Sequence, residues 1–286
     1  MLTMPRPGLW DIHIAVLLFG LAGLFGKFLT LPALIIVFGR TVFAALTLSL
    51  ALALGGATLR PRQGMARLAL SGAVLVLHWF TFFHAIQLSS VAIGLLGFAS
   101  FPLFITLLEP WTSGERLCPF DLLSAGLVSL GLVLVVPRFD LGDSLTQGLL
   151  WGIASGLSFA VLALLNRASR GESPLRVALW QNLWAALMLV PGLFWFGRWP
   201  MAAELGLLLL LGVVCTALSH ALFIRGLSAV RAQLAGLITA LEPVYGILFA
   251  FLLLGERPQP RTLLGGAVIL GTLVLVAWPR AGRHAA

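Results

Sequence analysis

Charged side chains are scarce in this chain of 286 residues. Asp, Glu, Lys and Arg together make up 10% of it, whereas they make up about 25% of a typical soluble domain. Hydrophobic residues account for 60%, so a water-soluble globule of this length would have too few polar groups to cover its surface. The composition therefore excludes a soluble protein and predicts one that is solvated by lipid.

Cysteine is nearly absent as well. Cys118 and Cys215 are the two cysteines, and their positions suggest neither a disulfide framework nor a metal site. No phosphate-binding loop, dinucleotide fingerprint or metal-ligand spacing occurs in the sequence. We therefore expect no cofactor, no enzymatic activity and no ATP hydrolysis. The net charge of +8 comes from arginines in short loops, which is typical of membrane orientation signals and does not favour a nucleic-acid partner.

Long apolar runs take the place of the missing charges. Each run is close to the ~20 residues that a helix needs to cross the hydrocarbon core, and the runs are too continuous for the alternating strands of a barrel. We predict an all-α polytopic membrane protein with ten transmembrane helices. The runs fall at about 9–29, 33–54, 66–87, 91–109, 121–137, 147–166, 174–196, 204–225, 232–254 and 262–278.

Several short motifs occur twice, always 141 positions apart. Trp10 recurs as Trp151, Ala44–Leu46 as Ala185–Leu187, Pro102 as Pro243, and Gly114–Arg116 as Gly255–Arg257. A duplicated membrane unit with an odd number of helices must insert its second copy upside down. We therefore predict two inverted five-helix repeats, residues 1–140 and 141–286, within one membrane domain. Transporters that open alternately to the two sides of a membrane have this architecture.

The arginines predict the orientation of the bundle. With the N-terminus in the cytoplasm, twelve arginines fall in inner segments and four in outer ones, as the positive-inside rule requires. Both termini are then cytoplasmic. The same orientation places Gly114–Arg116 inside and its copy Gly255–Arg257 outside, as inversion demands.

The segment Ala240–Tyr245, followed by Leu253–Arg257 and a Gly-rich last helix, resembles the drug/metabolite transporter superfamily, EamA type. Within it the chain is most similar to bacterial exporters of amino acids, particularly the aromatic amino acid exporters. The resemblance covers almost the whole chain and implies a multi-pass protein of the bacterial inner membrane with a central cavity. Phe101 stands where the second repeat has Glu242, so a symmetric two-carboxylate mechanism is in doubt.

Glu242 is the most informative charged residue. It lies near the middle of the ninth run, where a charge costs on the order of 3 kcal/mol, and Pro243 follows it. A carboxylate at this depth either takes part in transport, as a proton site or as the binder of a substrate amine, or forms a structural pair with a cation. Pro102 and Pro243 are the candidate hinges, because proline interrupts helical hydrogen bonding.

Arg40 and Lys27 are the candidate partners of Glu242. A guanidinium at the depth of Arg40 can bind a substrate carboxylate through two hydrogen bonds; alternatively it reaches the outer boundary. Lys27, the single lysine, either pairs inside the bundle or extends to the outer interface. Gln181 occupies the position equivalent to Arg40 in the second repeat.

Aromatic residues accompany these polar groups. His78 lies mid-span, with Trp79 next to it and Phe82 one turn later on the same face. Trp180 and Trp184 flank Gln181, and Tyr245 shares a helix face with Glu242. We expect these residues, together with Phe101, to line a path for flat or amphipathic molecules.

The function expected from the sequence is a secondary transporter that exports aromatic and other neutral amino acids and similar small amphipathic metabolites or drugs. We expect it to work by alternating access and as a monomer. Two alternatives stay open: a nucleotide-sugar or sugar-phosphate carrier of the same superfamily, which would need several basic residues in its cavity, and a lipid scramblase, which would need a polar groove open to lipid.

Overall fold

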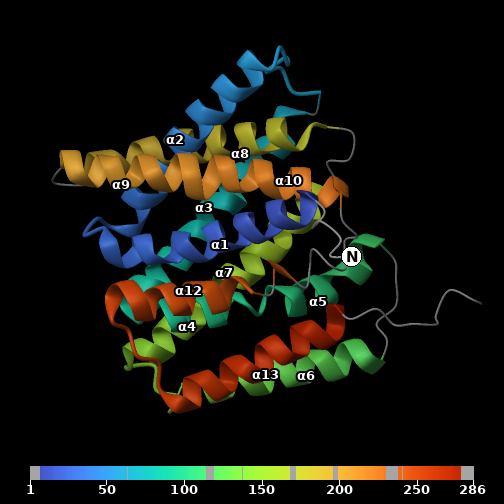
Figure 1. The fold of residues 1–286 in the computed structure, drawn as a ribbon, viewed down its shortest axis with the longest axis vertical. Helices are drawn as coiled ribbons and strands as arrows, with labels where there is room; N and C mark the ends of the chain where they lie inside the picture. Colours follow the sequence, from blue (N-terminus) through green and yellow to red (C-terminus); the bar gives the residue numbers. More distant parts are fainter. Residues whose placement is uncertain are drawn as a thin grey trace, which may run out of the picture.

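The computed structural model describes residues 7–62, 64–113, 119–136, 138–167, 172–195, 199–229, 238–239 and 241–277. Within these ranges every regular element is helical and no strand is present. Figure 1 shows the longer helices lying side by side as one bundle. The repeated motif Gly114–Arg116 and the inner-loop arginines Arg231, Arg280 and Arg283 lie outside the described residues.

Six helices lie in the described part of the chain before residue 140. They are α1 (Pro7–Phe28), α2 (Ala33–Leu54), α3 (Met65–Leu88), α4 (Val91–Phe98), α5 (Phe101–Ser113) and α6 (Pro119–Val135).

The later helices include three segments that are not α-helical. The elements are α7 (Ser144–Arg167), α8 (Pro174–Leu189), the 3₁₀ segment η1 (Val190–Trp195), α9 (Ala202–Gly212), the π segment η2 (Val213–Leu218), α10 (Ser219–Ala229), α12 (Glu242–Phe249), the π segment η3 (Ala250–Leu254) and α13 (Pro260–Ala277).

Seven helical segments of the described chain are long and apolar enough to cross a membrane. Three of the other expected segments contain shorter apolar helices, Leu122–Val135, Glu242–Leu254 and Pro260–Leu275. Leu46, Leu50 and Leu54 recur at one-turn spacing on α2 and are exposed, as expected of a face covered by lipid. The protein is therefore a multi-pass membrane protein made of helices.

The fourth expected span is interrupted. A turn at Ala99 and Ser100 separates α4 from α5, although the sequence reads as one apolar run. Ser100 Oγ donates a hydrogen bond to the carbonyl oxygen of Gly97 (2.7 Å), and Pro102 follows in the first turn of α5. Proline has no backbone N–H to continue the hydrogen bonding of α4, so its position next to the turn accounts for part of the interruption.

The most extensive helix contacts join the two halves of the chain. α3 packs on α7, α13 on α6, α1 on α10, and α2 on α8. The main hydrophobic core combines residues of both halves, including Phe25 and Phe83 from the first and Leu208 and Leu211 from the second. The interior of the bundle is therefore formed jointly by segments that are distant in sequence.

Candidate substrate-binding centre

Arg40 lies inside the bundle, on α2, and is 4% exposed. Its Nε donates a hydrogen bond to Thr216 Oγ1 of η2 (2.8 Å). Its guanidinium carbon lies 3.8 Å from the centre of the Trp79 ring and 5.8 Å from that of Phe83, both on α3. The aromatic faces stabilise the buried cation through cation–π interaction. One interpretation of the sequence had Arg40 extending to the outer boundary of the membrane. The structure instead places its side chain inside the bundle.

The two terminal nitrogens of Arg40 have no hydrogen-bond partner or ion pair in the part of the chain that the structure describes. They also retain contact with open space. The fully enclosed side-chain atoms without a partner, in that same part, are Asn182 Oδ1 and Trp184 Nε1. A guanidinium presents a planar pair of N–H groups that matches a carboxylate. Arg40 thus has the donors of an anion site without a protein anion.

Glu242 is the first residue of α12 and is partly buried. Its side chain and that of Arg40 carry opposite charges within the bundle. No ion pair within 4.0 Å joins them, and no hydrogen bond reaches the Glu242 carboxylate from any described residue. The guanidinium of Arg40 and the carboxylate of Glu242 therefore do not neutralise each other by direct contact. Such a pair can flank a ligand that carries both charges.

His78 is buried on α3, facing α7. Its Nδ1 lies 3.1 Å from the carbonyl oxygen of Ser155 and 3.0 Å from Ser155 Oγ. The imidazole ring is 5.0 Å from that of Phe159, 5.4 Å from that of Phe98 and 6.3 Å from that of Phe82. The predicted common face of His78 and Phe82 is confirmed. His78 is held both by a polar contact and by an aromatic wall.

Phe101 extends this wall beyond the turn at Ala99 and Ser100. Its ring stacks on Phe98 (5.3 Å between centroids) and meets Phe159 edge to face (5.1 Å). The candidate hinge Pro102 directly follows Phe101. A bend at this proline would therefore move one end of the aromatic wall.

The three candidate residues on α8 contact other parts of the protein. Trp180 Nε1 donates to the carbonyl oxygen of Leu59, in the loop between α2 and α3 (2.9 Å). Gln181 donates through Nε2 to Asn166 of α7. Trp184 lies against Gly72 of α3. The structure brings together Arg40 with Trp79, and His78 with Phe82 and Phe101, but it does not place Trp180 or Gln181 in direct contact with either group.

Tyr245 points toward α1. Its hydroxyl lies 3.4 Å from His13 Nδ1. Both residues line a pocket of about 410 Å³ that also includes Trp10. Tyr245 shares α12 with Glu242, so the candidate centre and this second pocket lie along the same helix.

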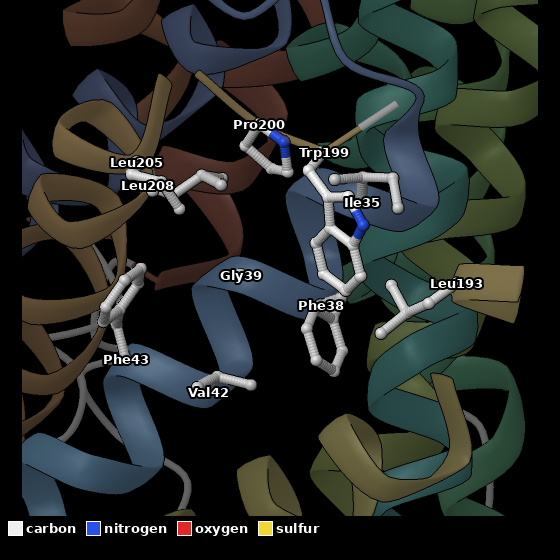
Figure 2. Close-up of a pocket in the computed structure, with 10 residues that line it drawn as sticks. All are labelled: Ile35, Phe38, Gly39, Val42, Phe43, Leu193, Trp199, Pro200, Leu205 and Leu208. Carbon is white, nitrogen blue, oxygen red and sulfur yellow. The ribbon is translucent and has the colours of Figure 1, made fainter. Parts of the chain in front are cut away.

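A pocket of about 200 Å³ lies between α2, η1 and α9. Figure 2 shows Phe38 and Phe43 of α2, Leu193, Trp199 and Leu208 around it. It contains Gly39 but not Arg40, and its lining residues carry no charge. A solute with charged groups would find no partner in it. We therefore place the candidate centre at Arg40.

A separate ionic cluster ties two loops together at the Trp180 end of α8. Glu172 accepts hydrogen bonds from the backbone N–H of Arg62, from that of Ser173 (3.0 Å) and from Arg176 Nε (2.7 Å). Desolvation acts to raise the pKa of Glu172, but these hydrogen bonds outweigh it and hold the pKa below its usual value. The cluster joins the loop between α2 and α3 to the start of α8.

Several partners of the centre were not predicted from the sequence. Thr216, Ser155 and Phe159 lie in uninterrupted apolar runs, where neither spacing nor charge distinguishes them. The ion pair between Asp11 and Arg225 (2.6 Å) could have been predicted, because both charged residues belong to apolar runs of the sequence. It joins α1 to α10.

Comparisons with known proteins agree with this architecture. A family model described as the EamA-like transporter family matches residues 6–136 and again residues 146–278. An uncharacterized transporter of Archaeoglobus fulgidus is 32% identical over 223 residues, 77% of each chain. The pseudopaline exporter CntI of Pseudomonas aeruginosa is 27% identical over 88% of this chain and 89% of its own. A solved crystal structure superposes with a TM-score of 0.68 at 21% identity, covering 94% of this chain and 96% of the other.

Proposed function

This chain belongs to the EamA-like transporter family, and we propose that it exports neutral amino acids, aromatic ones among them, and similar small amphipathic metabolites or drugs. The observation that carries the proposal is Arg40. It is a buried cation whose two terminal nitrogens have no partner among the described residues. Burying an uncompensated charge is costly, so the position favours a ligand that brings the missing anion. The carboxylate of an amino acid fits this requirement.

Glu242 supports an amino acid over a simple carboxylic acid. Its carboxylate has the charge opposite to Arg40, and no ion pair within 4.0 Å joins the two among the described residues. A zwitterion placed between them would offer its carboxylate to Arg40 and its ammonium group to Glu242. The same carboxylate can take up a proton during the cycle, so proton coupling belongs to this proposal.

The aromatic residues define the rest of the cargo. His78, Phe82 and Phe101 form one wall, while Trp79 stacks on Arg40. Rings in this arrangement accept flat or aliphatic groups by stacking and burial. Trp180, Gln181, Trp184 and Tyr245 would act further along the path rather than beside Arg40.

Alternating access is supported by contacts that repeat with the two halves exchanged. A side chain at Gly72 of α3 would meet Trp184 Cβ, Gln181 O and Ala185 N of α8. A side chain at Gly212 of α9 would meet Phe43 Cβ, Arg40 O and Ala44 N of α2. Adding 141 to the numbers of the three neighbours of Gly212 gives the three neighbours of Gly72.

The helix interruptions also occur in equivalent places. Ser100 lies in the turn before α5, and Leu241 lies in the turn before α12, 141 positions later. Pro102 and Pro243 follow them. Transporters with inverted repeats bind cargo where helices are interrupted in corresponding positions of the two halves. We infer ten membrane-crossing helices in two inverted repeats, 1–140 and 141–286, that bend at these prolines.

The remaining parts of the proposal concern setting and direction. The arginine bias supports both termini in the cytoplasm, and the family resemblance implies a bacterial inner-membrane protein. The named exporter among the relatives supports outward transport. The Ala240–Tyr245 and Leu253–Arg257 motifs resemble the superfamily as a whole, and the cargo class rests on the overall resemblance of the chain to amino acid exporters. A single chain contains both repeats, so a monomer is sufficient.

Counterflow in proteoliposomes tests the proposal. Purified protein is reconstituted in vesicles loaded with unlabelled phenylalanine, threonine or methionine. Uptake of the labelled amino acid is compared with uptake by empty vesicles, which contain no protein, and is measured with and without a proton gradient. We expect accelerated exchange for at least one of the three. Failure of all three to exchange faster than in empty vesicles would show that the cargo class is wrong.

Glu242→Gln tests the role of the carboxylate separately. The substitution keeps the shape and removes the charge, so we expect exchange of amino acids to fall about tenfold or more and its dependence on pH to flatten. Arg261→Gln, an exposed charge at the start of α13, is the matched control. Unchanged transport with an unchanged pH profile in Glu242→Gln would refute proton coupling and amine binding at this position.

A further inference from the structure

The repeated Gly-Glu-Arg motif has no role in the centre around Arg40, yet its second copy is tightly held. Gly255 follows the π segment η3 and has φ +68°, a left-handed conformation that glycine adopts without strain. The next residue, Glu256, donates its N–H to the carbonyl oxygen of Ala250 (3.2 Å). The turn directs the Glu256 side chain away from its own helix and toward α4.

The Glu256 carboxylate contacts the first turn of α4. The backbone N–H of Val91 donates to its two oxygens, at 3.0 Å and 3.3 Å. Negative charge is favourable at the start of a helix, where backbone N–H groups are unpaired. Ser90 caps the same turn by accepting the N–H of Ile93 (3.2 Å).

Lys27 completes the arrangement from the end of α1. Its Nζ donates to the carbonyl oxygen of Ser89 (2.8 Å), and its charge acts favourably on Glu256. The contact therefore joins α1, the α3–α4 junction and the loop before α13. We call Lys27, Ser89, Val91 and Glu256 the latch.

Behind the latch the bundle is closed. Leu95 lies one turn further along α4 and is 0% exposed, as are Ile86 and Leu96. Leu95 packs against Gly246 of α12, the helix that begins with Glu242. The close contact between Leu95 and Gly246 must loosen if a solute is to leave between α4 and α12 at this end.

The energetics of the latch allow it to open. Burial raises the pKa of Glu256, and the N–H groups of Val91 and Ala92 with the charge of Lys27 offset only part of that cost. A contact in which desolvation opposes attraction is worth less than its short distances indicate. It holds the end closed without making opening prohibitive.

The sequence supplies the lysine at one end only. The residue 141 positions after Lys27 is Ala168, whereas Glu256 has a counterpart in Glu115. The two copies of the motif are themselves identical, and Arg167 and Arg170 stand close to Ala168, so the second repeat offers arginine rather than lysine near the equivalent position.

We propose that Glu256 is a gate residue: by binding the first turn of α4 it holds the Lys27 end of the bundle shut, and it must release α4 before cargo can leave at that end. This inference rests on the proposed alternating access, and in the proposed orientation the gate faces the outside of the cell. Glu256 binds no cargo and acts through the position of α4.

The experiment measures opening directly. Cys118 and Cys215 are replaced by alanine, and Leu95→Cys introduces a thiol behind the latch. Cells are treated with a membrane-impermeant thiol reagent, and the rate of labelling is measured alongside counterflow. With the latch intact we expect slow labelling. Glu256→Ala should raise the rate roughly tenfold, the factor that corresponds to loss of about 1.4 kcal/mol from one closed state.

A backbone variant separates the latch from general damage. Val91→Pro removes the N–H that Glu256 accepts, while proline is favoured at the first position of a helix and Ser90 already has the extended conformation that precedes proline. It should raise labelling as Glu256→Ala does. Arg257→Gln, an exposed neighbouring charge, should leave the rate unchanged.

The outcomes are distinct. Fast labelling of the intact protein, or equal slow labelling in Glu256→Ala and Val91→Pro with normal elution and normal counterflow, would overturn the latch and leave the proposed function standing. Faster labelling in both variants without counterflow of any amino acid would support the latch while the cargo class fails. A rise seen only in inside-out vesicles would keep the latch and reverse the orientation.

Discussion

Arg40 illustrates how one side chain constrains function. The bundle contains this cation without an adjacent carboxylate among the described residues, and it holds the guanidinium by one hydrogen bond to Thr216 and by the face of Trp79. Cation–π contact contributes about 0.5–2 kcal/mol, which is less than the cost of burying a charge. The remaining cost is offset when a substrate anion binds, so this residue makes the empty site less stable than the occupied one.

Arg40→Lys keeps the positive charge and removes the planar pair of donors. A lysine cannot form two parallel hydrogen bonds to one carboxylate. We expect the KM of amino acid counterflow to rise roughly tenfold, with a smaller effect on the amide of the same amino acid, which lacks the carboxylate. Arg257→Lys is the control on an exposed arginine. Equal KM values for Arg40→Lys and the unaltered protein would exclude Arg40 as the carboxylate site.

At the scale of helices, the two close crossings at Gly72 and Gly212 set how tightly the halves meet. A Cβ at Gly72 would lie 2.6 Å from Trp184 Cβ, and one at Gly212 would lie 2.5 Å from Phe43 Cβ. Neither neighbour can rotate away, because a Cβ atom is fixed by its backbone. The helices therefore approach as closely as they do only because glycine stands at both positions.

Gly72→Ala and Gly212→Ala should each destabilise the protein by about 1–3 kcal/mol, since the helices must move apart. The thermal midpoint of the purified protein in detergent should fall by roughly 5 °C. Gly126→Ala on α6 is the control, because a Cβ there meets no atom within 4 Å, and alanine is the better helix former. A variant at Gly72 that melts with the control would contradict the tight crossing.

The same crossings show what the sequence concealed. The repeated motifs indicate a spacing of 141, yet Gly72 and Gly212, which have equivalent neighbours, are 140 apart. The π segment η2 begins directly after Gly212. A π turn accommodates one additional residue, which restores the spacing of 141 before Pro243. Hydrophobicity alone contains no sign of this, because Val213–Leu218 reads as ordinary helix.

Much of the helical architecture could be predicted because lipid leaves few choices for an apolar chain. The turn at Ala99 and Ser100 could not be predicted in the same way, since it lies inside one apolar run. Arg40, His78 and Glu242 could be selected as candidates because polar groups are conspicuous in apolar runs. Trp180 shows the limit: it stands inside an apolar run, but its hydrogen bond to Leu59 in the loop depends on tertiary contacts that the sequence does not display.

At the scale of the whole molecule, inversion makes a prediction about sidedness. Arg116→Cys and Arg257→Cys occupy equivalent positions of the two copies of one motif. With Cys118 and Cys215 replaced, a membrane-impermeant reagent applied to intact cells should label the cysteine at 257 and spare the one at 116, and inside-out vesicles should give the opposite pattern. Labelling of both from one face would rule out the inverted arrangement.

The packing between α3 and α7, α6 and α13, α1 and α10, and α2 and α8 has a consequence for how the protein can be assembled. Each half buries its interhelical contact surfaces against the other half, so neither half can fold as an independent unit. Continuity of the polypeptide around residues 138–143 matters less than the presence of both pieces. If the gene is split at this point and the two fragments are co-expressed, they should assemble into an active protein. Either fragment expressed alone should be degraded.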